Sequence, residues 1–269
     1  MMAFKKTGRV ALITGATSPD GVGYAIAESL ARNGFSIILH GRRDAEDVEP
    51  LRAKLERKHQ VKADYIRANL LERSEIENLC REVKTIYPGG VDVLVNNAGL
   101  SHRAKLEDFP PAKWDELIAV NLTAPFDLTR LLFGDMKRKG WGRIINISSV
   151  RSKIVDADSS VPYAAAKHGL NGLTKATAMA GLGSGVTCNA ICPALIKTKL
   201  AIELIEKATK RWGVSFEEAK KRILSTINPS GKFVTVEQVA ELASFLCTPA
   251  ADQITGAELP VDAGLWAKL

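Results

Sequence analysis

Short runs of apolar, often β-branched residues alternate along the chain with longer amphipathic stretches. Seven of these runs predict strands, at residues 9–13, 36–40, 63–67, 91–95, 143–147, 186–191 and 258–261. The stretches between them carry apolar residues at helical spacing and predict helices at residues 24–33, 49–58, 74–86, 111–139, 163–181 and 235–246. Such alternation is typical of parallel strands joined by right-handed crossovers. We therefore expect an α/β fold with a doubly wound, seven-stranded parallel sheet and helices on both faces.

Residues 199–230 interrupt this alternation. Leu200, Leu204 and Ala208 mark one amphipathic helix, and apolar residues from Phe216 to Leu224 mark a second. Ligands of open parallel sheets bind beyond the carboxyl ends of the strands. We interpret the insertion as a small helical lid over a substrate site; the alternative is a helical hairpin that forms a dimer contact. No linker divides the chain, so residues 1–269 are expected to form a single Rossmann-like domain that includes this lid.

Composition narrows the classes of function. The chain has 269 residues, of which 46% are hydrophobic and 25% charged, enough for a full core. Its net charge is +7, but the cations are interleaved with acids, so we expect neither nucleic acid nor a membrane as a partner. Without an apolar leader or a long apolar run, a cytoplasmic protein is expected. Cys80, Cys188, Cys192 and Cys247 lack metal or disulfide spacing, and no metal site is predicted.

A glycine-rich turn follows the first predicted strand. Thr14 ends the strand, and Gly15, Gly21 and Gly23 precede the next predicted helix. Glycine lets the backbone turn with positive φ and approach a ligand closely, and the free amides of a helix N-terminus favour an anionic pyrophosphate. Glycine turns also arise for geometric reasons alone. The position after the first strand is what favours dinucleotide binding here.

Two arginines follow the second predicted strand. Gly41, Arg42 and Arg43 stand where an NAD-preferring site usually presents an acid to the ribose 2′-hydroxyl. The guanidinium groups can instead clamp a 2′-phosphate. We therefore favour NADP(H) as the cofactor, with NAD(H) possible. In the alternative, both arginines are solvated and pair with Asp44 or Glu46.

Tyr163 and Lys167 lie four residues apart, on one face of a predicted helix. A phenol with a pKa of about 10 is a poor acid or base at neutral pH, and an ammonium beside it favours the phenolate. Such a pair alone is more often a packed ring beside a solvated amine. Ser149 shortly before it, and residues 96–99 after a strand, strengthen the interpretation of a proton-transfer site.

Together these motifs resemble the short-chain dehydrogenase/reductase family, single-domain type, over essentially the whole chain. The matching segments are Thr14-Gly15 with Gly21 and Gly23, Asn96-Asn97-Ala98-Gly99, Asn121 in Val120-Asn-Leu-Thr123, Ser149, Tyr163-Ala-Ala-Ala-Lys167 and Pro193-Ala-Leu-Ile-Lys-Thr198. The resemblance implies a catalytic set in which Ser149 holds the substrate oxygen and Tyr163 transfers the proton. It also implies that Lys167 lowers the Tyr163 pKa and holds the nicotinamide ribose, that Asn121 positions a relay water, and that the enzyme is a homotetramer.

The resemblance implies cofactor contacts as well. Beyond the glycine turn and the two arginines, these are Asn69, Leu70, Asn97, Ala98, Gly99, Pro193, Ile196 and Thr198, together with Tyr163 and Lys167. Within the family the chain resembles 3-hydroxybutyrate dehydrogenases most, through the framework segments 141–147, 166–170, 184–193 and 233–247.

The positions that those enzymes use on the substrate carboxylate differ here. Where the resemblance leads one to expect Gln, His, Lys and Trp, this chain has Ser101, Arg151, Ser160 and Leu195, in that order. One extra residue between Ser149 and Tyr163 means that Arg151 and Ser160 are matched to the family positions to within one residue. Arg151 and Lys153 can replace the missing cations, since a buried anion must be matched; alternatively both are exposed loop residues. We expect a substrate site formed by Ser101, Ser149, Arg151, Tyr163 and Leu195.

These patterns predict an NADP(H)-dependent oxidoreductase that interconverts a ketone and a secondary alcohol through a Ser-Tyr-Lys-Asn proton relay. The predicted substrate is a small hydroxy or oxo acid of the 3-hydroxybutyrate type. One alternative is a reductase of a neutral polyol or ketone or of a 3-oxoacyl thioester. A second is a non-catalytic dinucleotide-sensing protein, which would not need the complete relay.

Overall fold

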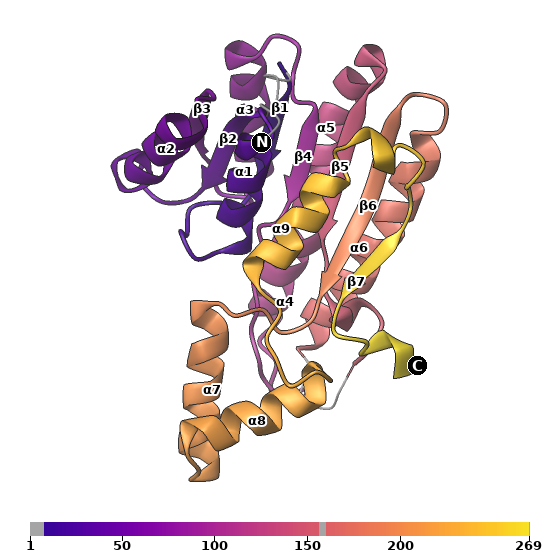
Figure 1. Cartoon of the computed structure of the whole chain (residues 1–269). Helices are drawn as coiled ribbons and strands as arrows, with labels where there is room; N and C mark the ends of the chain where they lie inside the picture. Colours follow the sequence, from indigo (N-terminus) through magenta and orange to yellow (C-terminus); the bar gives the residue numbers. More distant parts are fainter. Residues whose placement is uncertain (1–7, 156–159, 269) are drawn as a thin grey trace.

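The computed structural model describes residues 8–155 and 160–268, so residues 1–7, 156–159 and 269 of the predicted single domain lie outside it. Within this part, seven parallel strands form one sheet in the order β3-β2-β1-β4-β5-β6-β7 (Figure 1). The strands are β1 (Val10–Ile13), β2 (Ser36–Gly41), β3 (Ala63–Arg67), β4 (Val93–Asn96), β5 (Gly142–Ile147), β6 (Val186–Pro193) and β7 (Glu258–Val261). The predicted fold class is confirmed. The strand order reverses between β1 and β4, which opens a crevice at their carboxyl ends.

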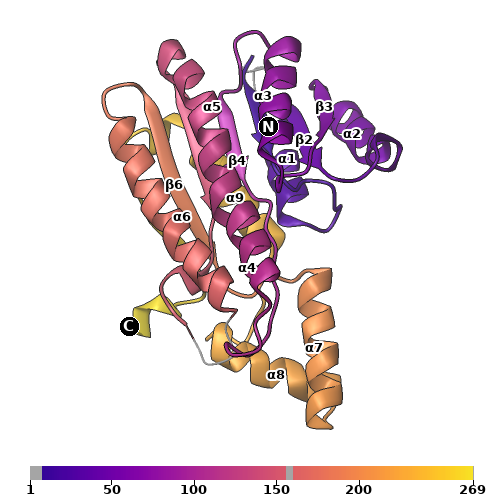
Figure 2. The same cartoon turned by 180° about the vertical axis from the view of Figure 1, so that it is seen from behind.

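Helices cover both faces of the sheet. One face carries α1 (Val22–Arg32), α2 (Ala45–His59) and α9 (Val236–Phe245), and the other carries α3 (Arg73–Ile86), α5 (Ala124–Lys139) and α6 (Val161–Ala180) (Figures 1 and 2). Adjacent strand residues therefore enter different cores: Ile37 packs with the first set of helices and Ile38 with the second. Because both faces are covered, the central strands are continuous apolar runs.

Local sequence sets several helix ends. Thr235 and Gln238 form a capping box at the start of α9, and Pro162 lies in the first turn of α6, where its missing N–H costs nothing. Gly140 ends α5 in the left-handed conformation, with φ of 65°. Short 3₁₀ turns lie at Val150–Ser152, Pro249–Ala251 and Trp266–Lys268.

The predicted helix over 111–139 is confirmed as one continuous helical stretch, Pro111–Lys139, with one local irregularity. It is divided into α4 (Pro111–Ile118) and α5 by the π-helical segment η1 (Ala119–Thr123), which contains the buried Asn121. A π turn admits an extra residue and shifts the register of the side chains that follow. By length and composition the whole stretch is apolar enough to cross a membrane, but half of its most apolar window is buried inside the protein, as in a core helix.

The insertion forms two helices, α7 (Lys199–Trp212) and α8 (Phe216–Ile227), which we call the arm. The arm projects from the carboxyl edge of the sheet (Figure 1) and has its own apolar cluster, which includes Ile205 and Ile223. Its two ends are tied together. Asn228, fully buried, accepts from Leu195 N at 3.1 Å and donates to Leu195 O at 3.1 Å. Two amphipathic helices are thus confirmed, whereas the role of a lid stays a prediction.

Candidate active site

Two adjoining hollows open at the carboxyl edge of the sheet. The outer hollow, of about 660 Å³, is lined by Gly15, Thr17, His40, Gly41, Arg42, Arg43, Asn69, Leu70, Asn97, Ala98, Gly99, Leu100 and Val120. The inner hollow, of about 380 Å³, includes Ser101, Arg103, Ser149, Arg151, Ser160, Tyr163, Lys167, Pro193, Leu195, Ile196 and Leu200. Asn97, Gly99 and Leu100 line both, so the two hollows form one continuous site.

The glycine turn is shaped by close backbone packing. Gly15 has φ of 64°, and a Cβ there would lie 2.9 Å from Ala98 Cα. The Asn97 side chain donates to Thr14 O at 2.8 Å and to Gly15 O at 3.1 Å, and a Cβ on Gly23 would lie 2.5 Å from its Nδ2. Both glycines are therefore required by contact with the segment after β4.

Four predicted cofactor residues, Thr14, Gly21, Gly23 and Thr198, are not among the described residues that line the two hollows. The buried Thr14 hydroxyl accepts from the backbone N–H groups of residues 97 and 98, at 2.9 and 3.0 Å. Gly21 is the N-cap of α1, and the Thr198 hydroxyl caps α7. These residues hold the walls in place.

The rim of the outer hollow is basic. Arg43 donates to Thr17 O at 3.0 Å and lies 3.7 Å from an Asp47 carboxylate oxygen. Asp44 pairs with Arg67, at 2.7 Å, and not with Arg42 or Arg43. In the described part of the chain no ion pair joins Arg42 to an acid, although it lines the hollow. Of the two predicted phosphate-binding arginines, Arg42 is thus the one with an uncommitted guanidinium.

Tyr163 and Lys167 share one face of α6, as their spacing predicts. Lys167 Nζ lies 5.5 Å from the centroid of the Tyr163 ring and donates to Ile147 O at 2.8 Å. Ser149, at the end of β5, reaches the same hollow, and its Oγ accepts from Arg151 N at 3.1 Å. Residues from α6 and from the β5 edge thus meet at one place.

Burial dominates the acidity of both groups. It raises the pKa of Tyr163, while the hydrogen bond with Ser149 and the positive charge of Arg151 lower it. Burial also lowers the pKa of Lys167 to about 8. The direction of the Tyr163 pKa is therefore set by desolvation, and not by the Lys167 ammonium as the sequence suggested. Tyr163 is a protonated phenol at neutral pH.

Asn121 is held by the π-helical segment. Its Oδ1 accepts from Leu100 N at 3.1 Å and its Nδ2 donates to Leu100 O at 2.9 Å. These two bonds tie α4 and α5 to the loop after β4, which lines both hollows. Asn121 is the member of the predicted set that lines neither hollow in the described structure.

The substrate side is basic and contains hydroxyl groups. Arg103, Arg151 and Lys167 line the inner hollow, with no Asp or Glu among its described lining residues. Ser101 and Ser160 also line it, and the buried Ser160 hydroxyl has no hydrogen-bond partner among the residues that the structure describes. All four positions that differ from the hydroxybutyrate pattern thus reach this hollow.

Lys153 does not contribute a cation to this site. Its ammonium lies 5.1 Å from the centroid of the Trp266 ring, outside the lining of the inner hollow. The Trp266 indole donates to Val150 O at 3.3 Å. The C-terminal turn therefore packs on the segment that follows Ser149, and of the two predicted carboxylate partners only Arg151 reaches the hollow.

Comparison with known proteins decides the family. A family model described as short chain dehydrogenase matches residues 9–209. The chain belongs to the short-chain dehydrogenase/reductase family. It is 42% identical over 258 residues to the D-beta-hydroxybutyrate dehydrogenase of Cupriavidus necator, covering 96% of this chain and 97% of that protein. The Rhizobium meliloti protein of the same name is 40% identical over 256 residues, with coverage of 95% and 98%.

Solved structures agree with this assignment. An actinorhodin polyketide ketoreductase with NADPH is 35% identical, with a TM-score of 0.88 over 97% of this chain and 98% of that one. The L-sorbose reductase of Gluconobacter frateurii, complexed with NADPH and L-sorbose, is 27% identical, with a TM-score of 0.90 and full coverage of both chains. This short-chain dehydrogenase/reductase is thus an oxidoreductase acting on CH–OH groups.

Sequence reasoning missed several residues of this dehydrogenase site. Thr17, in the glycine turn, packs against Gly41. A Cβ on Gly41 would lie 2.5 Å from Thr17 Cγ2, so only glycine at this position leaves room for the turn. Leu200, from the first turn of α7, lines the inner hollow although 67% exposed. His40 is buried in the outer hollow. Its signal was present in the sequence, as a single polar residue at the end of an apolar strand.

Proposed function

We propose that this protein is an NADP(H)-dependent oxidoreductase that interconverts a ketone and a secondary alcohol in a small hydroxy or oxo acid of the 3-hydroxybutyrate type. The observation that carries the proposal is the inner hollow. Tyr163 and Ser149 lie there beside Arg103 and Arg151. Hydroxyl donors for a reacting oxygen are thus combined with cations that can match a substrate carboxylate.

The outer hollow fits a nicotinamide dinucleotide. A Cβ on Gly15 would meet Ala98 and one on Gly41 would meet Thr17, so both glycines are needed for the shape of the wall of this hollow. The hollow runs on into the one that contains Tyr163, as an extended dinucleotide with one reactive end requires. Arg42 at its rim, uncommitted to any described acid, supports binding of a 2′-phosphate. The actinorhodin ketoreductase and L-sorbose reductase structures, both with NADPH, support the same preference.

The chemistry follows from the two hydroxyl groups. The bound dinucleotide supplies or accepts the hydride. Negative charge develops on the carbonyl oxygen during reduction, so donors from Ser149 and Tyr163 stabilise the transition state. Burial raises the pKa of Tyr163, so the phenol is protonated at neutral pH, while the hydrogen bond with Ser149 and the positive charge of Arg151 oppose this rise and so favour proton donation. Lys167, with a pKa of about 8, can return a proton to the phenolate that Tyr163 becomes after donating, and Asn121 holds the loop that joins the two hollows.

A second candidate function is reduction of a neutral, hydroxyl-bearing ketone. The buried Ser160 hydroxyl, which no described residue bonds, and Ser101 favour it, because both can bond a substrate hydroxyl. The similarity to L-sorbose reductase points the same way. A 3-oxoacyl thioester and a non-catalytic sensing role stay as alternatives, and the homotetramer and cytoplasmic location stay predictions.

The first experiment compares cofactors and substrates. We expect NADPH to bind more tightly than NADH in a fluorescence titration, and acetoacetate to be turned over faster than a neutral diketone or a 3-oxoacyl thioester. Arg42→Ala should weaken NADPH binding about 10- to 100-fold, the range for hydrogen bonds to a charged group, and leave NADH binding unchanged. Arg57→Ala, an exposed cation on α2, is the matched control. A preference for NADH would refute the arginine argument, and turnover of neutral ketones alone would refute the hydroxy-acid substrate.

A second experiment separates an enzyme from a sensor. Tyr163→Phe removes the proton donor and should lower kcat by about 10²- to 10⁴-fold while cofactor binding persists. Tyr87→Phe, remote from both hollows, should keep normal turnover. A wild-type protein that binds dinucleotide but turns over none of the three substrate classes would support the sensor instead.

A further inference from the structure

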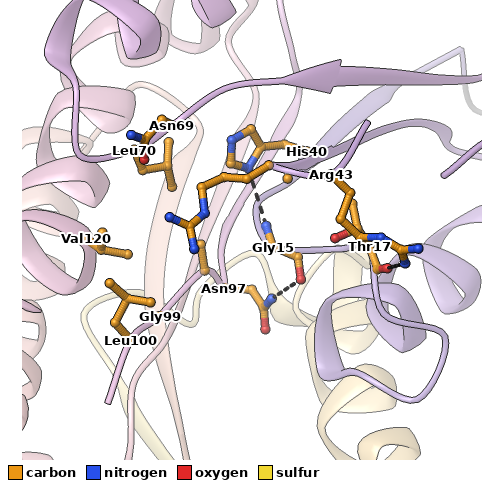
Figure 3. Close-up of a pocket in the computed structure, with 13 residues that line it drawn as sticks. Gly15, Thr17, His40, Arg43, Asn69, Leu70, Asn97, Gly99, Leu100 and Val120 are labelled. Carbon is orange, nitrogen blue, oxygen red and sulfur yellow. Dashed lines mark hydrogen bonds between the residues drawn. The ribbon is translucent and has the colours of Figure 1, made fainter. Parts of the chain in front are cut away.

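His40 occupies the floor of the outer hollow. It lies near the end of β2, is 2% exposed and lines the hollow between the glycine turn and the loop after β3 (Figure 3). Backbone bonds join β2 to both neighbours: Ala16 N donates to His40 O at 2.9 Å, and Ala68 N donates to Gly41 O at 3.1 Å. The imidazole adds a second connection between the same two walls.

Both ring nitrogens of His40 have a backbone partner. Gly15 N lies 3.4 Å from Nδ1, and Nε2 lies 3.1 Å from Ala68 O. An amide N–H can only donate and a carbonyl oxygen can only accept, so Nδ1 is unprotonated and Nε2 carries the hydrogen. The ring is therefore the neutral Nε2–H tautomer. Burial agrees with this state, since it lowers the pKa of His40 to about 4.

The two partners belong to walls that meet different parts of the proposed cofactor. Gly15 belongs to the glycine turn, and Ala68 immediately precedes Asn69 and Leu70, which line the outer hollow. In the proposed complex the turn meets the diphosphate and the loop meets the adenosine. If the distance between these two walls changes, the dinucleotide can no longer make its contacts to both walls at the same time. His40 contacts neither Tyr163 nor Ser149, which line the other hollow.

We propose that His40 is a positioning residue for dinucleotide binding: its neutral imidazole fixes the glycine turn relative to the Ala68–Asn69 loop and thereby sets cofactor affinity. This inference rests on the proposed function, because it presupposes that the outer hollow holds the dinucleotide. The role proposed for His40 differs from that proposed for Arg42 in one respect. His40 acts on the shape of the hollow and so affects NADPH and NADH equally, whereas Arg42 affects NADPH alone.

Three substitutions separate the two hydrogen bonds. His40→Asn places an oxygen where Nδ1 lies and keeps the acceptor for Gly15, whereas His40→Gln places an amide nitrogen where Nε2 lies and keeps the donor to Ala68. His40→Leu removes both. We expect Kd for NADPH and for NADH to rise about tenfold in the Asn and Gln variants and about 10- to 100-fold in the Leu variant, in line with the loss of one or two hydrogen bonds. At saturating NADPH, kcat should stay within about threefold of wild type.

The measurements are dinucleotide titration and steady-state kinetics, with circular dichroism to show that each variant is folded at the temperature used. Dissociation constants that stay within twofold of wild type in the folded variants would overturn the proposal, because a purely structural residue changes unfolding and not affinity. A large fall in kcat at saturation would also overturn it. If His40→Leu does not fold, the Asn and Gln variants decide. A wild-type protein that binds neither dinucleotide refutes the proposed function itself, whereas affected NADPH binding with unaffected NADH binding refutes only the role of His40.

Discussion

Lys167 gives the sharpest test of the site's electrostatics, because burial of its ammonium lowers the free energy of unfolding by an amount that can be measured. The side chain is 4% exposed, and burial lowers its pKa from 10.5 to about 8. A lysine whose pKa is lower in the folded than in the unfolded chain destabilises the fold wherever the unfolded lysine is protonated. We therefore expect Lys167→Met to abolish turnover and yet to make the protein more stable.

The size of the effect follows from the two pKa values. Each pKa unit corresponds to about 1.36 kcal/mol, so the burial of the ammonium costs about 3 kcal/mol at pH 7. Methionine has a similar volume but leaves Ile147 O without the bond that Lys167 makes at 2.8 Å, which costs about 1 kcal/mol. The net gain is about 2 kcal/mol, or a rise in Tm of about 4 °C for a chain of this length.

Urea unfolding of the protein without added dinucleotide, from pH 7 to 10.5, measures this gain. The full cost of the charge is present below pH 8 and disappears between pH 8 and 10.5, so the advantage of the variant should shrink by about 1.4 kcal/mol per pH unit in that window. Lys175→Met is the matched control: it is exposed on the same helix, paired with Glu258 at 2.6 Å, and should change stability by less than about 1 kcal/mol. A Lys167→Met protein that is less stable than wild type at pH 7, or whose difference does not depend on pH, would refute the reasoning.

Three further predictions concern the glycine turn, His40 and the arm. Gly23→Ala places a Cβ 2.5 Å from Asn97 Nδ2, so it should lower the unfolding free energy by about 1–3 kcal/mol and weaken dinucleotide binding. The control Gly172→Ala, with no atom within 4 Å of its new Cβ, should stabilise α6 by about 0.5–1 kcal/mol; equal effects of the two substitutions in urea unfolding would contradict the packing argument. The pKa of His40 falls from 6.5 to about 4 on folding, so the unfolding free energy of wild type should fall by about 1.4 kcal/mol per pH unit as the pH falls from 6.5 to 4. His40→Gln should lack this contribution to the pH dependence; unfolding free energies of the two proteins that fall in parallel with pH would contradict the neutral tautomer. Asn228→Ala removes bonds to Leu195 N and O and should cost about 2–4 kcal/mol; protease cleavage rates in the arm that match wild type would show that these bonds do not anchor it.

The strands and most helices could be predicted because positions buried in the core are apolar, so the pattern of apolar residues follows the pattern of burial. Ile37 and Ile38 face different cores, and this two-sided burial is what makes a parallel strand an uninterrupted apolar run. The arm was predictable for the same reason, since Leu204 and Ala208 on α7, and Phe216, Ala219 and Ile223 on α8, lie at helical spacing and pack in its small cluster. Proximity of Tyr163 to Lys167 followed from the spacing alone.

What the sequence did not predict depends on distant contacts. The π-helical segment exists where Asn121 bonds to Leu100, a partner 21 residues away that periodicity does not identify. The pKa of Tyr163 depends on burial by the whole fold, which four-residue spacing cannot report. Lys153 is turned away from the inner hollow by Trp266, which lies more than a hundred residues further along the chain.

The way the arm joins the sheet bears on how such enzymes diversify. It leaves the main body beside Leu195 and returns at Asn228, and these two residues are bonded to each other. Its apolar cluster is supplied mostly by its own helices. A segment that departs and returns at one point and packs largely on itself can be lengthened, shortened or exchanged while the catalytic framework keeps its geometry. Because Leu200 of the arm lines the inner hollow, we expect transplanted arms to change substrate preference while the residues around Tyr163 keep their positions.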